Sequence, residues 1–277
     1  MKKYLFCYIS LLMLISILMP CKVYAVDMSI GATTWYTWLE QEFSSNIDDY
    51  ISSHTEQKDD SAFLYGPVLS VKFNDDFNLS FVYLFGKFDT EQTMGDNTLK
   101  YELKRRDSDL ALNYRLNNYF KAFLGLKYIG FNISCQDKDK FSGGGPAGDV
   151  LNIKHNSLGP GLGLSATYPV YDNIFVLATI SGFCLWGKES KDFNNNIYRE
   201  KIKADYNDYG VNSTLSLAYY IAPAATTISL GGRFQYIKTY YRNFSNIDLG
   251  GGDVNPFDDG TTKFYGITLT ATYSFGI

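Results

Sequence analysis

The sequence is poor in the residues on which many enzymes and metal proteins depend. Among 277 residues there are two histidines, four cysteines and seven prolines. Beyond the first 25 residues only Cys135 and Cys184 remain, too far apart for a zinc spacing and too few for a disulfide scaffold. We expect two free thiols there, with a Cys135–Cys184 disulfide as the alternative. The scarcity of proline also leaves room for many strands.

Long apolar runs are missing too, apart from one at the start. Residues 4–19 are mainly apolar, follow Lys2 and Lys3, and precede a small-x-small site that ends at Ala25. This order is typical of a secretory signal peptide, so we expect cleavage after Ala25 and exclude residues 1–25 from the fold. An uncleaved anchor is the less favoured alternative, because a spanning helix needs roughly 20 apolar residues. No later stretch approaches that length, which excludes a helical membrane protein.

Basic charge is the next shortage. Removing Lys2, Lys3 and Lys22 from the 25 basic residues leaves 22 against 29 acidic residues, a net charge of about −7. An acidic surface repels polyanions, so we expect no nucleic-acid partner. The glycine runs at 143–145 and 250–252 lack the Lys-Ser or Lys-Thr pair and the helix of a phosphate-binding loop. We expect neither a cofactor nor a metal site.

Aromatic residues, in contrast, are abundant. The chain has 23 tyrosines and 20 phenylalanines, which favour strands. Apolar residues alternate with small or polar ones in short segments along residues 26–277, which we treat as one domain. The alternation predicts ten strands, at 28–39, 61–73, 77–85, 110–116, 120–128, 158–170, 174–186, 209–219, 228–236 and 263–275.

The connections between these strands alternate in length. Tight turns are expected near 74–76, 117–118, 172–173 and 222–223, and long polar segments at 41–60, 89–98, 132–154, 187–201 and 242–261. Outer-membrane barrels have short periplasmic turns, longer extracellular loops and an even strand number. The sequence therefore predicts an all-β fold, an antiparallel up-and-down transmembrane β-barrel of about ten strands with both termini on the side of the tight turns.

A soluble β-sandwich is the alternative fold, and the aromatic residues argue against it. Rings flank almost every expected tight turn, among them Phe77, Tyr114, Tyr168, Tyr219 and Tyr273. A membrane interface favours such rings at one depth, whereas a sandwich has no reason to place them there. The opposite strand face carries Gly, Ser, Thr and Asn with scattered charges, as the lumen of a barrel does.

The final strand also suggests a family. Residues 269–275, Leu-Thr-Ala-Thr-Tyr-Ser-Phe, resemble the last strand of bacterial outer-membrane β-barrel proteins, and the hairpin strands 109–115 and 123–128 resemble those of small barrels of this kind. The resemblance implies residence in the outer membrane of a Gram-negative cell. Its expected partners are outer-membrane lipid, lipopolysaccharide and the outer-membrane assembly machinery, and we expect a monomer.

Charged residues are expected inside the barrel. Apolar residues occupy odd positions before Leu103 and even positions after Leu110, so we place a bulge near 107–108. With the aliphatic face toward lipid, the expected lumen-lining charges are Lys72, Lys104, Arg106, Asp109, Arg115, Lys121, Lys127 and Arg233. They would line a narrow pore with anion preference or form a salt-bridged plug. The plug is favoured, because barrels near eight strands fill with side chains.

An enzyme of the outer leaflet is the alternative function. The omptin proteases also have ten strands and use an Asp-His pair, but neither His54 nor His155 has an aspartate two residues away. His155 and Ser157 share a strand face, as in the outer-membrane lipid A deacylase, yet no glutamate follows on that strand to orient the ring. We expect His155 to be an exposed loop residue, no catalytic residue, and a structural, surface-contact or narrow-channel role.

Overall fold

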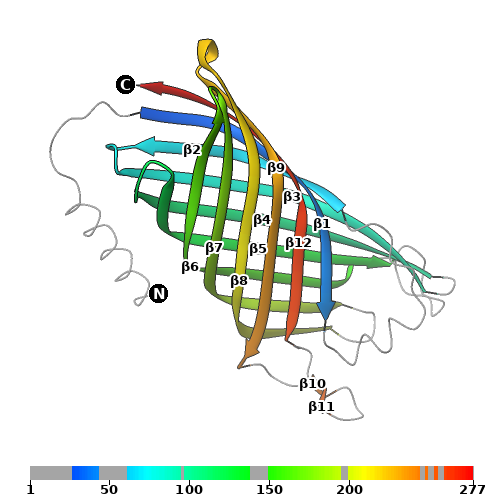
Figure 1. Cartoon of the computed structure of the whole chain (residues 1–277). Coiled ribbons are helices and arrows are strands. Elements are labelled where there is room, and N and C mark those ends of the chain that lie inside the picture. The colour runs from blue at the N-terminus through cyan, green and yellow to red at the C-terminus, as the bar shows by residue number, and fades with distance from the viewer. Residues whose placement is uncertain are drawn as a thin grey trace.

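The structure, a computed structural model, contains one closed antiparallel barrel (Figure 1). It describes residues 27–43, 61–94, 97–137, 149–194, 199–243, 247–248, 253–254 and 259–276. The barrel strands are β1 (Asp27–Phe43), β2 (Ser61–Lys72), β3 (Phe77–Met94), β4 (Asn97–Arg115), β5 (Phe120–Asp137), β6 (Asp149–Tyr171), β7 (Ile174–Asn194), β8 (Arg199–Ile221), β9 (Thr226–Arg242) and β12 (Gly260–Gly276). A short ribbon pairs β10 (Ile247–Asp248) with β11 (Asp253–Val254). The predicted cleavage site after Ala25 lies outside the described residues.

Each strand pairs with its neighbours in the chain, and the ring closes between the first and the last strand. Asp27 pairs with Gly276 at one end of β1, and Phe43 pairs with Gly260 at the other. In Figure 1 the blue β1 lies beside the red β12. The predicted up-and-down topology, with ten strands, is confirmed. Within the described segments no helix is long and apolar enough to cross a membrane.

Local sequence explains the tight turns. The side-chain oxygen of Asn74 accepts hydrogen bonds from the backbone N–H of Asp76 at 2.9 Å and of Phe77 at 2.8 Å. Asn117 does the same for Tyr119 at 2.8 Å and Phe120 at 2.9 Å. An asparagine oxygen in this position replaces a backbone carbonyl and closes the turn. All four tight turns lie where the sequence predicted them.

The half of the barrel nearest these turns has an apolar outer surface. Leu124, Leu162 and Leu215 are each more than 60% exposed, and similar side chains surround them on every side of the barrel. Aromatic pairs border the belt near the turns, with ring centroids 5.0 Å apart in Phe77–Tyr114. So much exposed hydrocarbon is stable only against lipid. This part of the barrel therefore spans the membrane.

The strands are much longer than the membrane requires. β6 and β8 have 23 residues each, which at about 3.3 Å per residue and a tilt near 45° gives roughly 50 Å, twice the apolar band of a typical barrel. The prediction of long loops at 89–98 and 187–201 is wrong, because β3, β4, β7 and β8 occupy most of those residues. The segment predicted at 132–154 is also strand at both ends, because β5 extends to Asp137 and β6 begins at Asp149. The described outward-facing residues there, such as Asp89 and Lys188, are polar because water surrounds them beyond the membrane.

Beyond the membrane the distribution of polarity is inverted. Trp35, Leu64, Phe88 and Phe264 point inward there and form a buried core. The predicted bulge at 107–108 is wrong, because β4 pairs with β3 and β5 without a register shift through these residues. Side-chain direction is continuous, and only the surroundings change from water to lipid. Lys104 and Arg106 therefore lie on the exposed outer face, which corrects their expected place in the lumen.

Candidate functional site in the lumen

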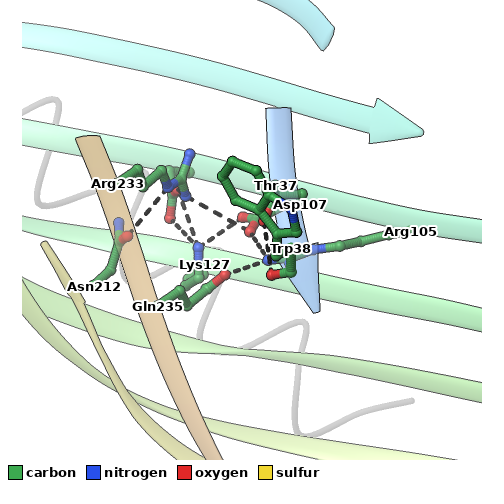
Figure 2. A network of polar contacts seen from close by, with 9 residues as sticks. Thr37, Trp38, Arg105, Asp107, Lys127, Asn212, Arg233 and Gln235 are labelled. Carbon is green, nitrogen blue, oxygen red and sulfur yellow. Dashed lines mark hydrogen bonds and ion pairs between the residues drawn. The ribbon is translucent and has the colours of Figure 1, made fainter. Parts of the chain in front are cut away.

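A network of charged side chains fills the centre of the barrel (Figure 2). Asp107 of β4 is 2% exposed and accepts hydrogen bonds from Arg105 Nη2 at 2.7 Å and Lys127 Nζ at 2.7 Å. Asp109, the next inward residue, lies 3.0 Å from Lys127 Nζ. Arg233 Nη2 of β9 approaches Asp107 at 3.7 Å and Asp109 at 3.8 Å. Three cations thus share two carboxylates.

This network crosses the lumen from wall to wall. β9 and β4 are third and eighth in the ring of ten strands, so they face each other. Arg105 of β4 donates a hydrogen bond to the side-chain oxygen of Gln235 on β9, and Arg233 extends toward Asp107 in the opposite direction. Arg233 is itself held by Asn212 of β8, whose side-chain oxygen accepts from Nε at 3.2 Å. Side chains therefore occupy the full width of the barrel at this level.

Aromatic rings close the space on the loop side of the network. The guanidinium carbon of Arg105 lies 3.7 Å from the ring centroid of Phe264 and 5.2 Å from that of Trp35. Arg233 lies 4.5 Å from the same Trp35 ring. Cations bind such ring faces, and more strongly where water is excluded. Among the described residues, the buried core defined above continues this layer toward the loops.

The side of the tight turns is different, because it contains two connected hollows. A cavity of about 340 Å³ extends below Asp109 and Lys127 and is lined by polar residues such as Ser80 and Ser181 together with apolar ones such as Phe123. A second, of about 380 Å³, reaches the mouth, and the two share Asn78 and Lys121. We call these two hollows the vestibule. Asp109 and Lys127 of the charged network line its inner end.

The structure places the eight expected lumen charges in three locations. Asp109, Lys127 and Arg233 belong to the central network, Lys72, Arg115 and Lys121 line the mouth of the vestibule, and Lys104 and Arg106 lie outside. At the mouth, the Lys72 ammonium hydrogen-bonds Asp75 in the adjacent turn at 2.8 Å and lowers the pKa of that carboxyl.

Sequence reasoning missed three members of the network, Arg105, Asp107 and Gln235. Strict alternation from Leu99 to Asp109 would have put the first two inside, because they share the odd positions of Leu103 and Asp109.

A second polar cluster surrounds His155 of β6, which is only 8% exposed. Its Nδ1 lies 2.7 Å from a carboxylate oxygen of Glu189 on β7, and its Nε2 lies 3.3 Å from one of Asp208 on β8. Both ring nitrogens can donate to carboxylates only in the protonated ring, so the contacts favour a charged His155. The expectation of an exposed loop histidine is wrong, because β6 starts at Asp149 and its odd residues point inward.

The carboxylates of this cluster are held by further donors. Ser157 Oγ donates to Asp208 at 2.8 Å, and Thr239 Oγ1 donates to the other oxygen of Asp208 at 2.7 Å. Tyr241 Oη donates to Glu189 at 2.7 Å. Glu189 reaches His155 through the pairing of β6 with β7, which the order of residues along one strand does not reveal.

Two further expectations concern metals and thiols. Among the residues that the structure describes, no group of three or more His, Cys, Asp or Glu side chains is arranged to hold a metal ion. Cys184 is a free thiol. The side chain of Cys135 lies outside the described part of the chain.

Comparison with known proteins identifies the fold. No family model matches the chain, and a search of curated proteins finds no match. The outer membrane protease OmpT from Escherichia coli is similar in structure, with a TM-score of 0.55 and 10% identity over 91% of this chain and 97% of that chain. A major outer membrane protein from Thermus thermophilus has a TM-score of 0.41 and 11% identity over 91% of this chain and 100% of that chain. At this identity the likeness to OmpT concerns the fold alone, which is that of outer-membrane β-barrel proteins.

Proposed function

We propose that this protein is a non-catalytic outer-membrane β-barrel that conducts no ions and acts as a rigid support for its surface loops, in a structural or surface-contact role. The observation that carries the proposal is the closure of the lumen between β4 and β9, through Arg105 with Gln235 and Arg233 with Asp107. The apolar belt and the fold support its place in the outer membrane. The strands beyond the belt raise the loops above the membrane surface.

The charged network argues against the alternative of a narrow anion channel. A passing ion would have to separate Arg105 or Lys127 from Asp107, whose side chain is 1% exposed. Breaking a buried ion pair by removing one partner costs about 3–5 kcal/mol, and each 1.4 kcal/mol corresponds to a factor of ten. Beyond the pair, the ion would still meet the aromatic core. Lys72, Arg115 and Lys121 can attract anions to the mouth, but the vestibule offers them no exit.

The geometry around His155 supports a non-catalytic protein over an outer-leaflet protease or lipid A hydrolase. A general base needs an unprotonated nitrogen that faces its substrate, whereas both nitrogens of His155 contact carboxylates. Ser157 has a single hydroxyl proton, and Asp208 accepts it. The side chains of His155, Ser157 and Asp208 are buried and point into the lumen, away from lipid and from the surface. Their contacts fit a role in joining β6, β7 and β8.

Single-channel recording in planar bilayers tests the proposal. We expect no stepwise currents from the wild-type barrel, with insertion verified by the different gel migration of folded and heated samples. The double variant Arg105→Ala with Gln235→Ala removes one of the two links across the lumen while leaving Asp107 paired with Lys127 and Arg233, so it should produce brief openings. Lys104→Ala, on the outer face, should stay silent. Steady anion-selective currents from the wild type would contradict the proposal.

A further inference from the structure

A group of basic side chains covers the outer surface of β6 to β9 on the loop side of the lipid-facing belt. We call this group the basic patch; its exposed, outward-facing cations are Lys154, Lys188, Lys201, Lys203, Lys238 and Arg242. Three acids share this face in the described residues, Asp192, Asp205 and Asp259. The excess of positive charge is unusual in a chain whose net charge is −4. This excess of positive charge requires either a negatively charged partner or exposure to solvent.

Strand register brings the central lysines of the patch together. Lys154 of β6 pairs with Ser190 of β7, which pairs in turn with Lys203 of β8. Lys188 lies one outward position nearer the membrane, between Asn156 and Asp205. Its side chain is 83% exposed, and its ammonium is 3.5 Å from Asp205. Three ammonium groups thus occupy neighbouring positions on one open face.

The height of the patch matches that of lipid head groups. Trp186, 57% exposed, and its partner Leu158, 43% exposed, end the apolar surface of β6 and β7. Lys188 follows Trp186 by two residues, and Lys154 precedes Leu158 by four. At about 3.3 Å per residue and a tilt near 45°, these lysines lie roughly 5–10 Å beyond the belt. Tryptophan is typical of the level where hydrocarbon meets head groups.

Outward-facing lysines on other strands, β3, β4 and β12, have close carboxylate partners. Lys87 lies 2.9 Å from Glu102 and Lys104 lies 2.7 Å from the same carboxylate. Lys263 of β12 lies 2.7 Å from Glu40. These three lysines are also on the outer face beyond the membrane, yet each has a close carboxylate partner. In the basic patch the Lys188 ammonium lies farther from its carboxylate neighbour, at 3.5 Å from Asp205, and six cations share the face with three acids.

We propose that the basic patch binds the phosphate groups of lipopolysaccharide in the outer leaflet, with Lys154, Lys188 and Lys203 as its principal contacts. The inference rests on the outer-membrane placement of the proposed function. Lysine is a flexible point charge that binds phosphate well, and the patch continues directly from the surface that contacts the acyl chains. One glycolipid can therefore place its chains on the belt and its phosphates on the lysines.

Binding of lipid A to the purified full-length protein in neutral detergent micelles tests this proposal. The probes are lipid A with both phosphates and the same lipid A after enzymatic dephosphorylation, followed by native mass spectrometry. The test variant combines Lys154→Gln, Lys188→Gln and Lys203→Gln. The control combines Lys87→Gln, Lys104→Gln and Lys263→Gln, which removes the same charge from positions that lie within 3 Å of a carboxylate. All samples must show the gel migration of the folded barrel.

We expect the wild type and the control to prefer the phosphorylated lipid. The test variant should lose roughly 100-fold in affinity for it, because each lysine near a charged surface contributes about fivefold. The proposal is overturned if both variants lose affinity equally, if the test variant binds as the wild type does, or if the wild type ignores the phosphates. A wild type that ignores the phosphates is the result expected if the basic patch binds an acidic protein instead. Ion currents would refute the closed lumen without changing this measurement, so the two failures are distinguishable.

Discussion

The buried carboxylate of Asp107 provides a sharp test of the charged network. Replacing it with alanine leaves Arg105 and Lys127, whose side chains are 0% and 4% exposed, without their shared partner. Removal of one member of a buried ion pair costs about 3–5 kcal/mol. Asp109→Ala is the matched control, because Asp109 lies two residues away on the same face but is 35% exposed. Its loss should cost about 1 kcal/mol or less.

Urea-induced unfolding of the two variants in lipid vesicles, followed by tryptophan fluorescence, gives the comparison. We expect the free energy of unfolding to fall several times further in Asp107→Ala than in Asp109→Ala. The reasoning relies on burial and on two hydrogen bonds of 2.7 Å, so it predicts an unequal effect for two chemically identical substitutions. Equal losses in both variants would refute it.

Three further predictions concern other parts of the barrel. His155→Ala should lower the free energy of unfolding by about 3–5 kcal/mol, since Glu189 and Asp208 lose their shared cation, whereas Ser157→Ala should cost about 1 kcal/mol; equal effects in chemical denaturation would contradict this. Gly266→Ala should be destabilising by about 1–3 kcal/mol, because a Cβ there would lie 1.9 Å from the Tyr36 carbonyl oxygen, while Gly182→Ala, with its nearest atom at 3.8 Å, should be tolerated in the same assay. Cys184 should react with N-ethylmaleimide in unfolded protein without reductant, and mass spectrometry showing modification only after reduction would indicate a disulfide instead.

The membrane-spanning half of the fold could be predicted from the sequence because lipid imposes a simple pattern on it. Apolar residues such as Leu124 and Leu162 must face outward at every second position, and asparagines such as Asn74 and Asn117 mark the tight turns. The other half obeys the opposite pattern, with apolar residues inside and charge outside. When outward-facing apolar residues are taken as the mark of a strand, the strands of this half resemble polar loops. For this reason the sequence predicts loops at 89–98 and 187–201.

The residues of the candidate site could be predicted only where a charged residue lies next to a strand segment whose apolar residues alternate clearly toward lipid. Asp109, Lys127 and Arg233 lie close enough to the lipid-facing segments for their inward direction to be inferred. Arg105 and Asp107 lie at the level where the apolar residues change from the outer to the inner face of the strand. In the sequence this change of face resembles a β-bulge.

The contacts of His155 depend on distant segments, because Glu189 is 34 residues away and Asp208 is 53 residues away. Only strand register brings them together. The order of residues in one sequence does not contain that register, so the polar cluster around His155 could not be predicted.

Side-specific labelling of a cysteine in the vestibule tests the closed lumen most directly. In a background with Cys135→Ser and Cys184→Ser, Ser181→Cys places a thiol in the cavity below the charged network, and Lys188→Cys places one on the exposed outer face beyond the membrane. Oriented proteoliposomes are treated with a membrane-impermeant maleimide on one side at a time. We expect Ser181→Cys to be labelled only from the side of the tight turns and Lys188→Cys only from the side of the loops. Labelling of Ser181→Cys from the loop side at a comparable rate would contradict the account, because reagent would then have passed the barrier between β4 and β9.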